Sequence, residues 1–395
     1  MKKVFVSLAV VASLVSCKKA EKDLPKTVAP KTYSFERNGK STVNFNGQTT
    51  RIKMAVEFVA ALKKTTETET TLDAKFAHTA GNADFSDADL NASSKNIRSK
   101  VAASKDFFSA NSTDATAIKN QFDGWIAAQV SEVFPNWNTD AAAGVAGKIQ
   151  QAGGGSTRYV NKKGVEYNQL IAKSLIGGLM VDQILNNYLS KAVLDEATNI
   201  ADNNGGVTAS GKNYTTMEHK WDEAFGYLYG AEDDITAPVL GKDSFLNKYL
   251  SRVEGDADFA GISKAIYDAF KLGRAAIVAK DYNTRNAQAE ILREKISEII
   301  GVRAVYYLQQ GKGKLATDKA AAFHDLSEGL GFVYSLQFTR KPNSSESYFT
   351  KAEVDTFMDT LLKDNGFWDV SGATLDQISN SIAGKFNFTL AQAAN

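Results

Sequence analysis

The sequence predicts an all-α fold: a duplicated antiparallel helical bundle preceded by a short N-terminal β-hairpin or extended segment. Apolar residues recur at three- and four-residue spacing through most of the 395 residues, as in amphipathic helices. Only 5 residues are proline, so few positions interrupt such helices. Two of the expected helices also share one pattern of His, Glu, Gly and aromatic residues, which indicates an internal repeat.

The first element has the order of an export signal. Residues 1–3 are Met-Lys-Lys, an uncharged and mostly apolar run covers 4–15, and Ser16-Cys17 follows. About 12 such residues are too few to span a bilayer, which needs about 20. Leu14-Val15-Ser16-Cys17 resembles the lipobox of bacterial lipoproteins. The resemblance implies that residues 1–16 are a signal peptide and that Cys17 carries a lipid.

Cys17 is the only cysteine in the sequence, so a protein lipidated there has no disulfide and no thiolate metal site. The expected location is the outer membrane, on its periplasmic or cell-surface face, with residues 17–32 as a charged tether. Removal of the signal peptide leaves 44 basic side chains (46 − 2) against 45 acidic ones. This near-neutral balance gives no reason to expect a nucleic-acid partner.

After the tether, residues 33–46 alternate apolar and polar side chains around Asn38-Gly39, which predicts a hairpin and the only sheet-like element. About nine helices should follow, from Gln48 onward and then over roughly 113–134, 164–200, 215–234, 258–280, 285–310, 317–337, 350–363 and 372–385. We group them into three units: residues 33–160, a first helical repeat over 161–255, and a second repeat with the C-terminal helices over 256–395.

Two glycine- and acid-rich features are expected to be structural. Gly153-Gly154-Gly155 lacks the Lys-Ser/Thr ending of a phosphate-binding loop and should be a plain connector. The acidic clusters at 84–89 and 254–258 lack the spacing of an EF-hand and should cap helix starts. His78 stands in a polar stretch and is expected at the surface.

The repeated pattern is the most informative feature for function. Residues 219–229 and 324–334 place His, Glu, Gly, an aromatic residue and Tyr at identical offsets, 105 positions apart (324 − 219). Each His stands four residues before a Glu, so both side chains share one helix face. If the two copies converge, the pairs could hold iron or zinc. The candidate metal or ligand site comprises His219, Asp222, Glu223, His324 and Glu328.

A structural interpretation stays open beside this one. A His on a half-apolar helix commonly bonds the Glu of its own helix, and a duplicated fold duplicates its structural residues. The aromatic residues of both copies would then pack in the core.

The lipobox, together with residues 47–54, 219–229 and 365–368, resembles an uncharacterised family of Bacteroides-type lipoproteins over nearly the whole mature chain. More distantly, the paired helices are similar to imelysins and iron-regulated envelope proteins, which are built from two packed helical bundles. That resemblance implies iron or haem acquisition beside an outer-membrane transporter. His219 and Asp222 match the His and acid of the imelysin signature, whereas Ser327 departs from it in the second copy.

Three functions follow from these observations. The first is an envelope-anchored, ligand-binding lipoprotein associated with iron or haem acquisition. The second is a metallopeptidase of imelysin type, and the third is a metal-free protein- or carbohydrate-interaction module. The sequence has no His-Glu-x-x-His motif and no Gly-x-Ser-x-Gly motif, which favours binding over catalysis.

Overall fold

The longest helix is α12 (Tyr282–Lys314) in this computed structural model, which describes Met1 and residues 27–395. At 33 residues it is about 50 Å long. It packs against α11 (Ile262–Val278), α13 (Lys319–Ser335) and α15 (Gly372–Phe386). The predicted signal peptide after Met1, the predicted lipidation site Cys17 and most of the predicted tether lie outside the described residues.

Helices make up about 60% and strands about 4% of the structure. The helices of the N-terminal part are α1 (Asn46–Ala61), α2 (Glu69–Phe76), α3 (Ala88–Ala92), α4 (Lys105–Phe108) and α5 (Ser112–Ala128). Then come α6 (Tyr167–Leu175), the π-helical η5 (Ile176–Tyr188), α7 (Lys191–Leu194), α8 (Asn199–Gly205), α9 (Thr216–Tyr229) and α10 (Leu246–Glu254). After α11, α12 and α13, the chain ends with α14 (Lys351–Leu361), α15 and α16 (Leu390–Ala393).

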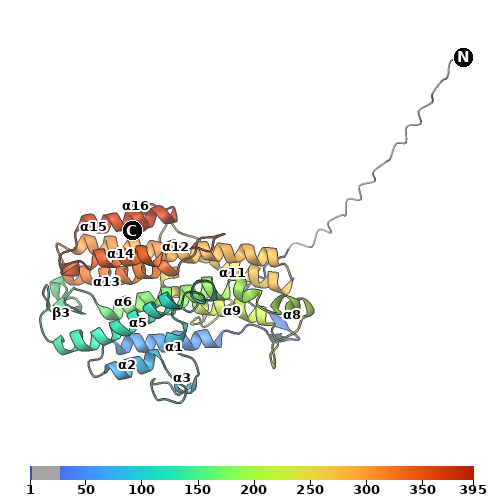
Figure 1. Cartoon of the computed structure of the whole chain (residues 1–395), viewed down its shortest axis with the longest axis horizontal. Coiled ribbons are helices and arrows are strands. Elements are labelled where there is room, and N and C mark those ends of the chain that lie inside the picture. Colours follow the sequence, from blue (N-terminus) through green and yellow to red (C-terminus); the bar gives the residue numbers. More distant parts are fainter. Residues whose placement is uncertain (2–26) are drawn as a thin grey trace.

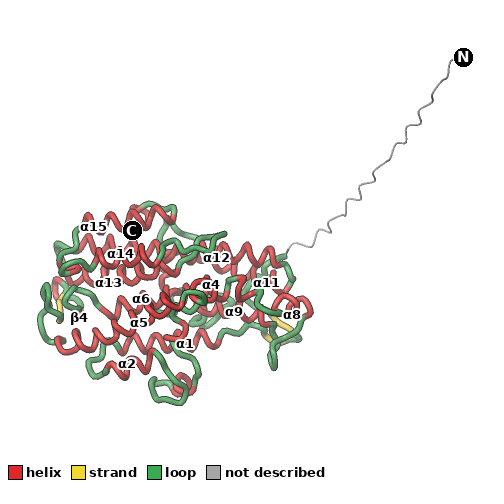
Figure 2. The backbone as a smooth tube through the Cα atoms, viewed as in Figure 1, coloured by secondary structure: helices red, strands yellow, loops and turns green. Residues whose placement is uncertain are grey.

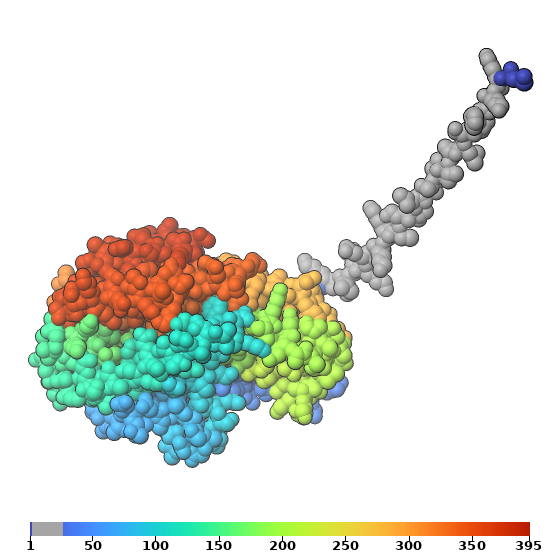
Figure 3. All heavy atoms as spheres, in the orientation of Figure 1, coloured from blue at the N-terminus to red at the C-terminus, as the bar shows by residue number. Residues whose placement is uncertain are grey.

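The helices form stacked layers (Figure 1). α12 and the C-terminal helices lie on one long side of the body, α1 and α2 lie on the opposite side, and α6 and α9 run between them. The tube and space-filling views give the same order (Figures 2 and 3). One continuous hydrophobic core extends from Tyr33 to Ala393 and crosses the boundaries of the three units expected from sequence.

The bundle is not antiparallel throughout. α6 and η5 run in the same direction as α13, because the Glu166 amide meets Ser327 and the Gly177 amide meets Ser335. A Cβ on Gly331 would lie 2.8 Å from the Leu170 carbonyl oxygen, so glycine allows this close approach. The fold is mostly helical as predicted, but the structure does not show the duplication.

The expected hairpin is present as β1 (Glu36–Arg37) and β2 (Lys40–Ser41), paired antiparallel. The prediction that it would be the only sheet was wrong, because β3 (Gly147–Gln150) and β4 (Thr157–Val160) form a second hairpin. The glycine triplet is the connector of this hairpin. Four residues per strand are too few for the alternation of side chains to stand out in the sequence.

The helix expected over 164–200 is continuous only from Tyr167 to Tyr188. It starts as α6, widens into the π-helical η5 and ends at Tyr188, after which Ser190 precedes α7. The short helices α2 and α10 were missed, because eight or nine residues hold too few apolar repeats to reveal a period. No helix among residues 27–395 is both long and apolar enough to cross a bilayer.

The prediction that His78 lies at the surface was wrong. Its ring is buried, with Nδ1 2.5 Å from an Asp84 oxygen and Nε2 3.2 Å from the Asn91 carbonyl oxygen. The polar stretch folds around the ring because its own Asp and Asn residues supply both partners. In the acidic cluster at 84–89, Asp87 caps α3 as expected. In the cluster at 254–258, Glu254 accepts hydrogen bonds from amides at the start of α11.

Candidate functional site

The two His/Glu pairs line two separate pockets. The α9 pocket, of about 500 Å³, is lined by residues that include Gln48, Arg51, Lys100, Tyr188, His219 and Glu223. The α13 pocket, of about 790 Å³, is lined by residues that include Lys248, Arg252, Arg303, Tyr306, His324 and Glu328. The two linings share no residue within the described chain, so the structure does not bring the pairs together.

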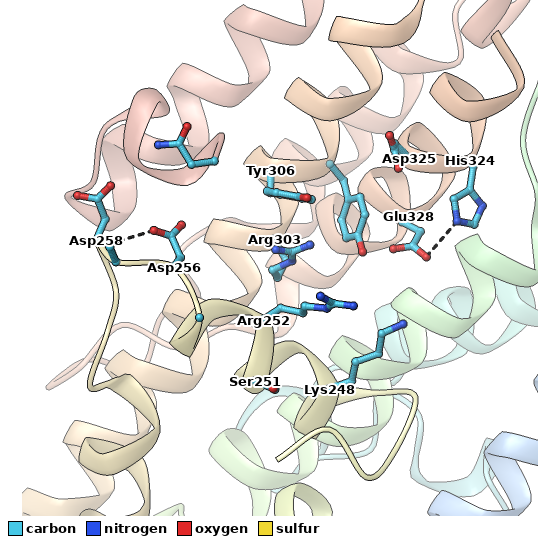
Figure 4. Close-up of a pocket in the computed structure, with 14 residues that line it drawn as sticks. Lys248, Ser251, Arg252, Asp256, Asp258, Arg303, Tyr306, His324, Asp325 and Glu328 are labelled. Carbon is cyan, nitrogen blue, oxygen red and sulfur yellow. Dashed lines mark hydrogen bonds and ion pairs between the residues drawn. The ribbon is translucent and has the colours of Figure 1, made fainter. Parts of the chain in front are cut away.

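His324 lies on the first turns of α13, at the wall of the α13 pocket (Figure 4). Its Nδ1 is 2.9 Å from an oxygen of Glu166, the buried residue before α6. Its Nε2 is 3.6 Å from an oxygen of Glu328, one helical turn further along α13. The ring is therefore held between two carboxylates, one from each helix.

Glu328 is held by residues from three other helices. Lys173 of α6 lies 3.3 Å from one carboxylate oxygen, and the Tyr249 hydroxyl of α10 donates to the other at 3.2 Å. Burial alone would raise the pKa of Glu328, but the Lys173 cation and a hydrogen bond from Tyr307 of α12 lower it to about 2. Glu328 is thus ionised at neutral pH and neutralised by Lys173.

Arg303 of α12 is the most buried cation that lines the α13 pocket, and the rings of Tyr249, Tyr306 and Tyr307 face its guanidinium. It is only 6% exposed and stacks against Tyr306, with the guanidinium carbon 3.8 Å from the ring centroid. Within the described chain no carboxylate lies within 4 Å of it and no hydrogen bond satisfies it, and its Nε is buried without a partner. Figure 4 shows it in the middle of the pocket.

Two further cations, Lys248 and Arg252 of α10, lie beside Arg303. Burial lowers the pKa of Lys248, and the cations of Lys173 and Arg252 lower it further. The acids Asp256 and Asp258 lie on the other side of Arg303, away from His324 (Figure 4). On the His324 side, the lining acids Asp325 and Glu328 are paired with Lys314 and Lys173, whereas the three lining cations have no carboxylate within 4 Å in the described chain.

His219 of the α9 pocket has looser surroundings. It stacks on Tyr214, with ring centroids 4.6 Å apart, and its Nε2 is 4.0 Å from an oxygen of Glu223. Burial lowers the pKa of His219. Glu223 accepts hydrogen bonds from Lys220 of its own helix at 2.9 Å and from Gln48 of α1 at 3.1 Å.

Asp222 does not belong to either pocket. It is fully buried on another face of α9, where it pairs with Arg274 of α11 at 3.0 Å and accepts a hydrogen bond from the Tyr33 hydroxyl at 2.7 Å. At the matching position, Ser327 accepts a hydrogen bond from the Glu166 amide. Both side chains join helices, so the position three residues after each His is structural.

No group of three or more His, Cys, Asp or Glu residues among those described could hold a metal ion. The two carboxylates around His324 lie against opposite ring nitrogens, which explains why they do not converge on one point.

Residues 30–389 match a protein family described as a domain of unknown function (DUF4856). The chain belongs to this family. No curated protein matches the DUF4856 chain, and no solved structure matches it. The more distant resemblance to imelysins therefore remains a prediction.

Sequence reasoning missed most of the residues that shape the α13 pocket of this DUF4856 protein. Glu166, Lys173 and Tyr249 come from α6 and α10, and no local pattern links them to His324. Arg303 did leave a signal. It is a charged residue inside the apolar run Ile299-Ile300-Gly301-Val302 and Ala304-Val305, at a position where a helix should face the core.

Proposed function

We propose that this DUF4856 protein is an envelope-anchored binding protein whose principal site is the α13 pocket, and that its ligand is an anion in iron or haem acquisition. One observation carries the proposal. Arg303 presents a buried guanidinium to the pocket without a carboxylate or a hydrogen-bond acceptor within the described chain. A buried charge without a partner is costly, and a bound anion would remove that cost.

The neighbouring groups fit a carboxylate-bearing ligand. Arg303 and Arg252 can each form paired hydrogen bonds to a carboxylate, and Lys248 adds a point charge. Tyr306 offers an aromatic face beside Arg303 for an apolar or ring part of the ligand. Glu328 does not compete for these cations, because Lys173 already compensates its charge.

The link to iron rests on ligand chemistry and on the sequence resemblance. Ferric carboxylate chelates and haem both carry carboxylates that an arginine cluster can bind, and His324 lies at the same pocket. A binding role is favoured over a peptidase, because a hydrolytic zinc site needs three protein ligands and the described residues offer no such group. The anchor at Cys17 and an outer-membrane transporter as partner belong to this proposal.

The contact between tether and body supports an anchored arrangement. The Thr27 hydroxyl donates to Asp281, immediately before α12, and Lys271 donates to the Lys31 carbonyl oxygen. The segment that would lead to the membrane thus lies against the body near the turn between α11 and α12 (Figure 1).

We also propose that the two pockets arose by duplication of a helical unit. The identical offsets of His, Glu and Gly support it, as does the packing of both helices on one continuous helix. α13 packs on α6, and α9 packs on its continuation η5.

The experiment compares Arg303→Gln with the wild type in calorimetric titrations with citrate, ferric citrate and haemin. We expect the wild type to bind at least one of these probes and the variant to bind it at least about tenfold more weakly, because a charge-assisted pair is lost. Arg98→Gln is the matched control, since Arg98 pairs with Asp123 outside both pockets. Equal affinity of Arg303→Gln and the wild type, or no binding of any probe, would refute the proposal.

The same titrations test the His residues. If ferric citrate or haemin binds through the α13 pocket, His324→Ala should weaken binding and His219→Ala should not. If the double variant His219→Ala/His324→Ala bound metal and haem as the wild type does, neither His would belong to the binding site.

A further inference from the structure

The N-terminus of α1 opens onto the α9 pocket without a cap. Phe45 stands at the cap position and offers no side-chain acceptor. The amides of Asn46 and Gly47, both of which line the pocket, have no hydrogen-bond acceptor among the described residues. A helix of 16 residues with free amides at its start carries a partial positive charge there.

Cations surround this helix end in excess of acids. Six line the α9 pocket against two carboxylates, Glu196 and Glu223. Lys105 pairs with Glu196 at 2.5 Å and Lys220 pairs with Glu223 at 2.9 Å. The other four, which have no carboxylate within 4 Å in the described chain, are Arg51, Lys95, Lys100 and Lys212.

Of two buried side chains of α1 at the pocket, Gln48 points to a missing ligand independently of the helix end, and Arg51 adds a positive charge that has no carboxylate within 4 Å in the described chain. Gln48 is 1% exposed and lines the pocket; its amide nitrogen is within 3.1 Å of Glu223, but its carbonyl oxygen has no partner. Arg51 is 6% exposed and donates only to the backbone carbonyls of Asn96 and Gly47. Burial and the Arg51 cation also lower the pKa of Lys100, which shows that these charges repel one another.

We propose that the α9 pocket is a second ligand site, which binds a phosphate or sulfate group carried by a small hydroxylated molecule such as a sugar. The free amides of α1 and the four uncompensated cations bind the oxyanion, whose two charges match them better than a single carboxylate would. The unused Gln48 oxygen accepts a hydrogen bond from a ligand hydroxyl. The site shares no lining residue with the α13 pocket in the described chain and does not depend on the function proposed there.

The test is calorimetric titration of the full mature chain at low salt with inorganic phosphate, glucose 6-phosphate and glucose. We expect glucose 6-phosphate to bind more tightly than phosphate, and glucose not to bind. The double variant Lys100→Gln/Lys212→Gln should bind glucose 6-phosphate at least about tenfold more weakly. Added salt should weaken wild-type binding, because the contacts are ionic.

Three control variants establish that a loss of binding arises at the α9 pocket. Lys53→Gln changes an exposed lysine on the same helix that does not line the α9 pocket and should bind as the wild type does. Lys100→Arg keeps the charge and should retain binding, which assigns a loss in the glutamine variant to the missing charge. Arg303→Gln should leave glucose 6-phosphate binding unchanged. Failure of the proposal for the α13 pocket can therefore be told apart from failure of the inference for the α9 pocket. Absence of phosphate-dependent binding, or equal binding in the double variant, would overturn the inference.

Discussion

The α9 and α13 pockets begin from the same helical pattern and differ in what other helices bring to it. In both, a His and a Glu stand four residues apart on one face. In the α13 pocket Glu166, Lys173 and Tyr249 from two other helices fix the pair. The α9 pair relies on Lys220 of its own helix and on Gln48.

This difference shows that spacing along one helix does not define a site. The charge of Glu328 is compensated from outside α13, which leaves Arg303 uncompensated and turns the pocket towards anions. In the α9 pocket the uncompensated charges are Arg51 near the start of α1 and lysines of short connecting segments. We therefore expect both pockets to bind anions, but with different groups.

The largest expected effect concerns the residue three positions after each His. Asp222→Ala should lower the free energy of unfolding by about 3–5 kcal/mol, because Arg274 would remain buried with its main partner removed. Ser327→Ala should cost about 1–3 kcal/mol, because it leaves the Glu166 amide without an acceptor. Urea denaturation measures both. Equal costs, or unchanged stability in Asp222→Ala, would contradict the structural role of Asp222.

The second prediction concerns pH. The fall in the pKa of Glu328 from 4.5 to about 2 corresponds to about 3 kcal/mol of native-state stability. Because the folded-state pKa is the lower one, this stability is present above pH 4.5 and is lost as the pH falls towards 2. The stability advantage of the wild type over Glu328→Gln should therefore shrink as the pH is lowered from about 6 to 3.

Glu223→Gln is the matched control for the pH series. Burial acts to raise the pKa of Glu223, but Lys220 and His219 outweigh it and lower the pKa. The stability advantage of the wild type over Glu223→Gln should therefore also shrink as the pH is lowered. The change should be smaller, because Glu223 is more exposed than Glu328. A pH-independent difference between the wild type and Glu328→Gln would show that the Lys173 ion pair contributes nothing.

The smallest expected effect compares the His residues themselves. His324→Ala removes the partner of the buried Glu166 carboxylate and should cost about 1–3 kcal/mol. His219→Ala removes a stacking contact with Tyr214 and should cost about 0.5–1.5 kcal/mol. Thermal unfolding of the two variants measures the order. A greater loss of stability in His219→Ala than in His324→Ala would contradict the prediction that His324 is the more firmly held of the two.

Long periodic helices were predictable from sequence, and short or irregular elements were not. The expected helices over 215–234, 285–310 and 372–385 correspond to α9, α12 and α15. The sequence did not predict the second hairpin, α10 or the π-helical geometry of η5, because their form depends on packing against the rest of the fold. The candidate site residues remain a prediction. His324 and Glu328 line a pocket of about 790 Å³, whereas Asp222 lies on another face of its helix and pairs with Arg274.

The sequence by itself determined the helical character, the likeness of α9 and α13, and the four-residue spacing of each His and Glu. These properties depend on residues near one another in the chain, where helix geometry fixes which side chains share a face. Only the tertiary structure decided that the two pairs lie in separate pockets, that Asp222 pairs with Arg274, and that Arg303 has no partner among the described residues. Those outcomes depend on contacts between distant helices, because the charge and burial of a side chain are set by whichever elements pack around it.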